Sequence, residues 1–223
     1  MYGRTSRHIV QTDRSVILLG PKSSGKSTLF YKLIGESTSG GCKRRIAQHE
    51  VNNGGLVYDI GLKYLKESLH KTNEAICITF YDVNIPDNCD ISLAKVHWDH
   101  FSTAAYAVFY LVDCSGSINS NTPIKNNPFH DTLQLYDDTS VYFNKESTKI
   151  IFICTKCELG NENLNSAAIN ATRAFCQSNG YLCLTASMLD DRSLTHPLTH
   201  SLTHSLTHSL NHSINQSGAL SIY

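Results

Sequence analysis

Hydrophobic and polar positions along the chain follow a succession of short apolar runs and amphipathic segments. Residues 15–20 form an apolar run that ends in glycine, which is typical of a buried parallel strand. Apolar side chains in residues 27–34 recur with helical spacing, and Gly35 is a natural helix stop. The pattern therefore predicts a strand followed directly by a helix.

The same kinds of pattern continue over the body of the chain. Further strands are predicted at residues 55–65, 75–82, 105–113, 149–154 and 181–184. Further helices are predicted over residues 90–101, 129–143 and 163–180, with polar loops over residues 36–53 and 115–128. This alternation predicts an α/β fold with right-handed crossovers, a mostly parallel central sheet and helices on both faces.

The last part of the chain has a different character. From Ser193 the sequence repeats Ser-Leu-Thr-His with few departures. The tetranucleotide TCAC, read as TCA-CTC-ACT-CAC, encodes this unit, so we interpret residues 188–223 as a disordered, translated low-complexity repeat. Alternatively, the repeat histidines could chelate a metal if the segment were helical (His196, His200, His204, His208 and His212). Residues 1–14 are predicted to be a flexible segment, which leaves 15–187 as the domain.

Composition narrows the function classes. The chain of 223 residues has 19 basic and 19 acidic side chains, so its charge gives no reason to expect nucleic acid or an anionic membrane as a partner. Its start lacks the apolar core of a signal peptide. Several of the eight cysteines lie in strand-like runs and are expected to be small buried hydrophobes in a reducing, cytoplasmic location. Cys154 and Cys157 form a CxxC without a second ligand pair.

The loop between the first strand and the first helix carries a phosphate-binding pattern. Gly20, Gly25, Lys26 and Ser27 satisfy GxxxxGK[ST], in which backbone N–H groups surround a β-phosphate. Lys26 is expected to reach the terminal phosphates and Ser27 to bind Mg²⁺. The whole stretch is the predicted phosphate site: Gly20, Pro21, Lys22, Ser23, Ser24, Gly25, Lys26, Ser27 and Thr28.

A second metal-binding position is predicted at the end of a later strand. Asp82 closes the run ICITFYD and is the natural partner of Ser27 around Mg²⁺. The alternative is an aspartate that only caps a turn at a strand end. The predicted metal residues are thus Ser27 and Asp82.

Two late motifs resemble the base-contacting loops of GTPases. CTKCE, at 154–158, resembles [NT]KxD, with Glu158 where an aspartate is usual. LTASM, at 184–188, resembles the loop whose backbone N–H binds the guanine oxygen. The predicted base-contacting residues are Thr155, Lys156, Glu158, Thr185, Ala186 and Ser187. Together with the phosphate loop, these motifs occur in the order of a P-loop NTPase of the Ras-like G-domain type.

The parts that sense a γ-phosphate are missing. Ile85 and Pro86 stand where DxxG and a following glutamine are expected, and Ser37 and Thr38 are switch candidates by position alone. Phosphoryl transfer depends on positioning and electrostatic stabilisation, so little or no hydrolysis is expected and no residue is predicted to be catalytic. The repeat also begins where such a domain has its final helix, which is predicted to be lost.

These features resemble the G-like domain of the dynein light intermediate chains. The resemblance rests on GPKSSGKST, GLKYLKE at 61–67, ITFYDVN, CTKCE and RAFCQSNGYLCLTAS at 173–187. It implies a non-catalytic subunit that binds the dynein heavy chain, in the cytoplasm and on microtubules. Its pocket would hold Mg²⁺ with GTP or GDP, with ATP and an empty pocket as alternatives.

The resemblance is incomplete, and a second interpretation stays open. The family's adaptor-binding C-terminal region is expected to be absent or replaced by the repeat. The alternative is a divergent small GTPase of Ras or Rab type, acting in membrane traffic or signalling. Such proteins usually end in a prenylated cysteine, but no cysteine follows Cys183, so no direct membrane anchor is expected.

Overall fold

The structure is a computed structural model that describes residues 11–34, 44–45, 56–66, 75–85, 91, 95–115, 128–159 and 162–186. Its strands are β1 (Gln11–Leu19), β2 (Arg44–Arg45), β3 (Val57–Lys66), β4 (Ala75–Asn84), β5 (Ala105–Asp113), β6 (Lys149–Thr155) and β7 (Leu182–Ala186). Its helices are α1 (Lys26–Ile34), α2 (Lys95–Ala104), α3 (Pro128–Thr139), the short 3₁₀ helix η2 (Ser140–Tyr142) and α4 (Glu162–Asn179).

The strands form one sheet in the order β2-β3-β4-β1-β5-β6-β7. Every pair from β4 through β1, β5 and β6 to β7 is parallel, whereas β3 pairs antiparallel with both β2 and β4. The connection between β3 and β4 is too short to hold a crossover helix, so these strands form an antiparallel pair. The prediction of an α/β fold with a mostly parallel sheet is confirmed.

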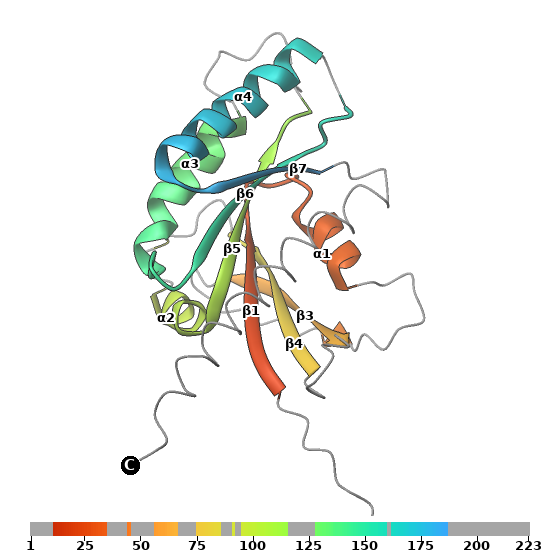
Figure 1. Cartoon of the computed structure of the whole chain (residues 1–223), viewed down its shortest axis with the longest axis vertical. Helices are drawn as coiled ribbons and strands as arrows, with labels where there is room; N and C mark the ends of the chain where they lie inside the picture. The colour runs from red at the N-terminus through yellow and green to blue at the C-terminus, as the bar shows by residue number, and fades with distance from the viewer. Residues whose placement is uncertain are drawn as a thin grey trace, which may run out of the picture.

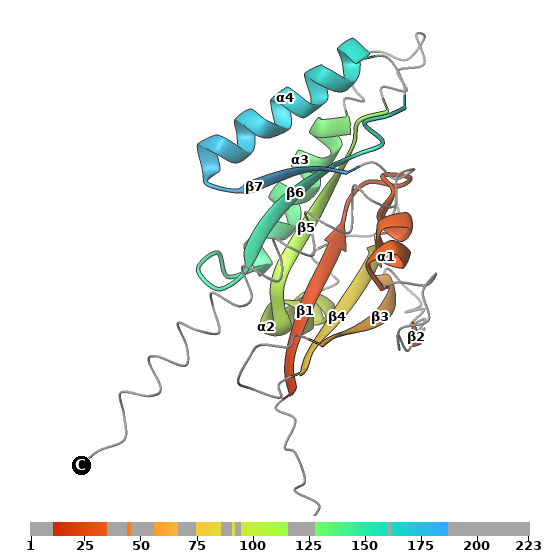
Figure 2. The ribbon, with the colours of Figure 1, turned by 45° about the vertical axis from the view of Figure 1, so that its right-hand side comes forward.

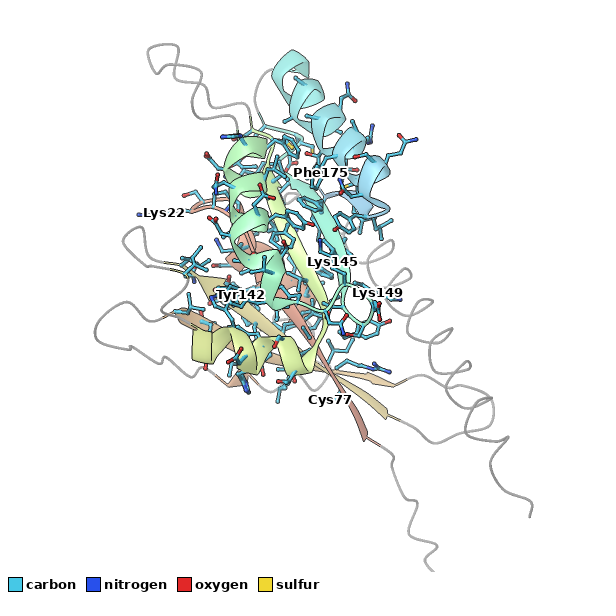
Figure 3. The ribbon with its side chains drawn as sticks, turned by 90° about the vertical axis from the view of Figure 1, so that its left-hand side faces the viewer. Lys22, Cys77, Tyr142, Lys145, Lys149 and Phe175 are labelled. Carbon is cyan, nitrogen blue, oxygen red and sulfur yellow. The ribbon has the colours of Figure 1, made fainter. Side chains whose placement is uncertain are left out.

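Helices cover the sheet on both faces, as predicted (Figures 1 and 2). Helix α1 packs on one face, where its apolar side chains join residues of β1, β4, β5 and β6 in one core cluster. Helices α2, α3 and α4 lie on the other face, which Figure 3 views, over a second and larger cluster. The predicted loss of a final helix after β7, and the predicted repeat tail, concern residues outside the described ranges.

Several boundaries differ from the pattern-based prediction. Strand β1 begins at Gln11, not at residue 15, because its polar first residues pair with β4 from Ala75 onward. These residues belong to the sheet, so the predicted flexible segment 1–14 does not extend to residue 14. Strand β2 falls within the predicted loop 36–53 and pairs with Gly61 and Ile60 of β3. A strand of two residues is too short to show a hydrophobic periodicity, so the sequence pattern could not predict it.

The helices follow the predicted order, and the bounds of α1 and α4 agree with the prediction to within one residue. Helix α2 begins at Lys95, later than the predicted residue 90. Helix α3 ends at Thr139 and continues as the 3₁₀ helix η2, so the predicted helix over 129–143 is two elements. In the described part of the chain, no helix is long and apolar enough to cross a membrane.

Candidate functional site

A cavity of about 1220 Å³ opens at the carboxyl end of β1. The loop between β1 and α1 forms one wall, and Asn84 at the end of β4, the following Ile85 and Ile91 form another. All the predicted phosphate-site residues except Ser24 line it: Gly20, Pro21, Lys22, Ser23, Gly25, Lys26, Ser27 and Thr28. Ser24, in the same loop, is fully buried.

The loop approaches the sheet closely and carries backbone strain. A Cβ added at Gly20 would lie 2.7 Å from the Ser24 Oγ and 3.0 Å from the Leu111 carbonyl oxygen, so the loop needs glycine there. Ser23 and Lys156 have left-handed φ angles of 63° and 55°, and they are the only non-glycine residues of the described ranges with positive φ. Both line the cavity. Strain of this kind concentrates at functional sites.

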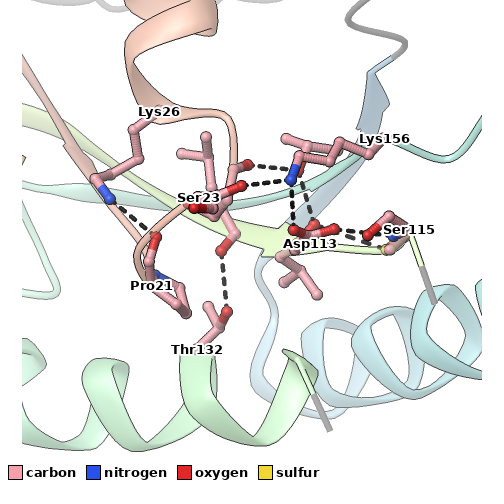
Figure 4. Close-up of polar contacts among 12 residues, drawn as sticks. Pro21, Ser23, Lys26, Asp113, Ser115, Thr132 and Lys156 are labelled. Carbon is pink, nitrogen blue, oxygen red and sulfur yellow. Dashed lines mark hydrogen bonds and ion pairs between the residues drawn. The ribbon is translucent and has the colours of Figure 1, made fainter. Parts of the chain in front are cut away.

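Lys26 folds back onto its own loop. Its ammonium donates hydrogen bonds to the carbonyl oxygens of Gly20 at 2.7 Å and Pro21 at 3.0 Å (Figure 4). The side chain is 5% exposed. Burial lowers the pKa of Lys26, and the nearby Asp82 carboxylate partly opposes this shift. The lysine is therefore a buried cation that an anionic ligand in the cavity would stabilise.

The predicted metal residues Ser27 and Asp82 lie side by side. The Ser27 hydroxyl donates to Asp82 Oδ2 at 2.6 Å, although these residues belong to α1 and β4. Asp82 is fully buried, and burial raises its pKa, opposed by the hydrogen bond from Ser27 and the charge of Lys26. Its second oxygen, Oδ1, has no hydrogen-bond partner among the described residues. A buried carboxylate oxygen without a hydrogen-bond partner and an adjacent hydroxyl group are a suitable pair of oxygen ligands for a hydrated Mg²⁺.

The second and third residues of the CTKCE motif, Thr155 and Lys156, contact the loop between β1 and α1. The buried Thr155 hydroxyl contacts the carbonyl oxygens of Ser24 at 2.7 Å and Val112 at 3.1 Å. The Lys156 ammonium donates to the Ser23 carbonyl oxygen and, at 2.6 Å, to Asp113 Oδ2 (Figure 4). The motif thus holds the phosphate loop against the ends of β5 and β6.

Asp113 is a site residue that the motifs did not predict. It ends β5, accepts the Ser115 N–H at 2.9 Å and pairs with Lys156. Burial alone would raise its pKa, but the hydrogen bonds from Lys156 and Ser115 outweigh burial and leave the pKa below its ordinary value. Its place at the end of a buried strand, level with Thr155 on β6, is the signal that could have identified it.

The remaining base-contacting predictions are spread more widely. Glu158 is exposed and does not line the cavity, Thr185 is exposed near the end of β7, and Ala186 is buried. Ser187 lies outside the described residues, as do Pro86 and the switch candidates Ser37 and Thr38. The base-contacting arrangement of these residues stays a prediction.

Helix α3 supplies a wall of the cavity that sequence patterns did not indicate. Asp131, Gln134, Leu135 and Asp138 line it, and the Gln134 amide donates to Asp138 at 3.0 Å. The adjacent Thr132 hydroxyl donates to the Leu111 carbonyl oxygen at 2.9 Å and so fixes the helix to β5 (Figure 4). The wall was not predicted because its residues are ordinary polar positions of an amphipathic helix.

Over the described residues, no group of three or more histidine, cysteine or carboxylate side chains could hold a metal ion. A metal at Ser27 and Asp82 would therefore take its other ligands from phosphate and water, as Mg²⁺ usually does. No protein-family model matches the chain, and no curated protein matches it significantly.

Proposed function

We propose that the chain binds the phosphates of a nucleotide, together with Mg²⁺, in the cavity beside the β1–α1 loop. The observation that carries the proposal is the pairing of Ser27 with a buried Asp82 whose Oδ1 lacks a partner among the described residues. The ammonium of Lys26, held by carbonyl oxygens of its own loop, supplies the complementary cation. Bound phosphate and Mg²⁺ would satisfy both groups at once.

The position of the cavity supports assigning the domain to the P-loop NTPases of Ras-like type. In open α/β sheets, ligands bind outside the carboxyl ends of the strands, where the strand order reverses direction. Strand β1 lies between β4 and β5, and the loop that follows it opens into the cavity. The N-terminus of α1 adds positive potential at the same point.

Hydrolysis is expected to be slow or absent in this proposal. Ile85 lines the cavity at the position where a γ-phosphate-sensing glycine is expected. The glutamine that lines the cavity, Gln134, donates its amide to Asp138 on the same helix. Nucleotide would then stabilise the fold by RT ln(1 + [L]/Kd) without a cycle of turnover.

The motif resemblance extends this proposal to a non-catalytic subunit of a cytoplasmic dynein complex. CTKCE, GLKYLKE and RAFCQSNGYLCLTAS carry that resemblance, and the heavy chain is the proposed partner. Purification of the tagged full chain, with identification of co-purifying proteins, tests it. Recovery of dynein heavy chain supports the subunit, whereas effectors that require GTP support the small-GTPase alternative.

The nucleotide half of the proposal has its own readout. Nucleotide extracted from the purified protein and identified by chromatography reports both occupancy and base. The Lys26→Met variant should lose nucleotide, whereas Lys145→Ala, which changes an exposed lysine before β6, should retain it. If nucleotide-free wild-type protein binds no added nucleotide, the nucleotide-binding proposal is contradicted. The proposed heavy-chain partner would still be tested separately by the co-purification experiment.

A further inference from the structure

Five cysteines form a continuous group on the α4 side of the sheet. Cys114, Cys154 and Cys176 are buried, whereas Cys157 and Cys183 are partly exposed. The side chains of all five pack in the core cluster on that face of the sheet. The expectation that the cysteines are small buried hydrophobes therefore holds for Cys114, Cys154 and Cys176, whereas solvent partly reaches Cys157 and Cys183.

The end of α4 places Cys176 against Cys183. The helix ends at Asn179, and Gly180 takes a left-handed φ of 70°. The Tyr181 N–H then donates to the Cys176 carbonyl oxygen at 2.8 Å, which completes a Schellman turn. This turn reverses the chain, so that Cys176 in the last turn of α4 and Cys183, the second residue of β7, pack in the same core cluster.

Cys183 has the environment of a reactive thiol. Hydrogen bonds from the thiols of Cys154 and Cys176 lower its pKa, and the charge of Arg173 acts in the same direction. By contrast, the hydrogen bond to Cys183 and burial raise the pKa of Cys176. Cys183 is also the one of these three thiols that solvent partly reaches. Thiolate character and access together set the rate of cysteine oxidation.

We propose that Cys183 is a site of oxidation by peroxide, and that Cys176 resolves it by forming a reversible disulfide between α4 and β7. The Cys183 thiolate attacks one oxygen of hydrogen peroxide, which breaks the O–O bond and yields a sulfenic acid and hydroxide. The Cys176 thiol then attacks that sulfur, and its proton leaves with the sulfenic hydroxyl as water. The hydroxide from the first step takes up the proton that Cys183 released to solvent when it formed the thiolate. Two thiols are oxidised and one peroxide is reduced to two waters.

Cys154 is a less suitable partner for this disulfide. Cys183 is in register with Phe152, so Cys154 lies two residues farther along the neighbouring strand. That diagonal separates the Cα atoms by about 8 Å, from the usual strand spacing and rise. Disulfides rarely span more than about 7 Å between Cα atoms. Strand β6 is paired on both sides and cannot shift to shorten the distance.

The test treats the reduced full-length chain with hydrogen peroxide and maps the products by mass spectrometry of unreduced peptides. We expect a linked Cys176–Cys183 peptide that dithiothreitol reverses. Cys176→Ser should leave a sulfenic acid on Cys183 that dimedone traps. Cys183→Ser should slow oxidation of Cys176 by about tenfold or more. Cys77→Ser, at a buried position on β4, is the control and should behave as wild type; Figure 3 shows Cys77 well apart from Phe175 of α4.

A measurement on the wild-type chain does not depend on the folding of any variant. Brief alkylation with iodoacetamide at neutral pH should label Cys183 before Cys154 and Cys176. Labelling of Cys183 no faster than of these two would overturn the proposal. So would a peroxide-induced disulfide that omits Cys183.

Discussion

The two ends of the cavity are built differently. At the end beside Lys26, the buried Asp82 Oδ1 has no hydrogen-bond partner among the described residues, and the Lys26 ammonium donates to carbonyl oxygens of its own loop. At the other end, Lys156 is held by Asp113 and Ser23. Buried polar groups are usually satisfied in native structures. The difference supports the proposal that a ligand completes the end at Lys26 and Asp82, whereas the end at Lys156 is completed by groups of the protein itself.

The largest effect is expected at Lys26. Lys26→Met should weaken binding of a magnesium nucleotide by about 10- to 100-fold, because a hydrogen bond to a charged group contributes about 1.5–3 kcal/mol. The free energy of unfolding without nucleotide should change little, because the variant also removes a buried charge. Isothermal titration and urea unfolding measure the two quantities. Large destabilisation of the ligand-free protein would mean that Lys26 is structural.

Asp82 should control the dependence on metal. Asp82→Asn removes the negative charge that Mg²⁺ requires and should weaken nucleotide binding by about tenfold in magnesium, an effect of about 1.4 kcal/mol. In EDTA, the variant and wild type should bind nucleotide alike. Asp99→Asn, at an exposed position of α2, is the control and should bind nucleotide as wild type does. Equal loss with and without magnesium would show that Asp82 acts only on the fold.

Asp113 should affect the fold more than the ligand. Asp113→Asn leaves the shape but removes the charge that holds Lys156, and we expect a loss of about 1–2 kcal/mol in the free energy of unfolding. Its effect on the magnesium dependence of nucleotide binding should be small. A double-mutant cycle with Lys156→Met isolates the pair. A strong loss of nucleotide affinity at unchanged stability would place Asp113 in the ligand site.

The smallest expected effect is a difference in pH dependence between Asp82, at one end of the cavity, and Asp113, which pairs with Lys156 at the other. The pKa of Asp82 is raised by burial. At subsaturating Mg²⁺, the ionised form that binds the metal should therefore be lost as the pH falls, at a pH above the range in which an ordinary aspartate is protonated. The pKa of Asp113 is lowered, so its stabilising contribution is present above its unfolded-state value and lost only as the pH falls through its folded value. Thermal unfolding with and without magnesium nucleotide across acidic pH should show these losses in that order.

The parts of the site that could be predicted from sequence are those whose residues lie close together along the chain. The phosphate loop is contiguous, and its residues follow a strand and open a helix, so its motif located one wall of the cavity. Asp82 could be predicted because it directly ends an apolar run. The pairing of Lys156 with Asp113 links positions 43 residues apart, and no local pattern encodes it.

The fold shows the same division. Apolar runs predicted β5 and β6 well because both are buried throughout. The polar beginning of β1 and the two residues of β2 take their structure from partners across the sheet, so periodicity could not reveal them. The α3 wall was missed for the same reason: which face of a helix borders a cavity is decided by packing.

The most direct test of the phosphate site is titration of the nucleotide-free full chain with GDP, GTP and ATP, each with and without Mg²⁺. We predict saturable one-to-one binding that magnesium strengthens and that Lys26→Met weakens. The effects of magnesium and of Lys26→Met should be similar for the guanine and the adenine nucleotides, because both act on the phosphates. Absence of binding to wild type at millimolar nucleotide, or binding that Lys26→Met leaves unchanged, would contradict the account.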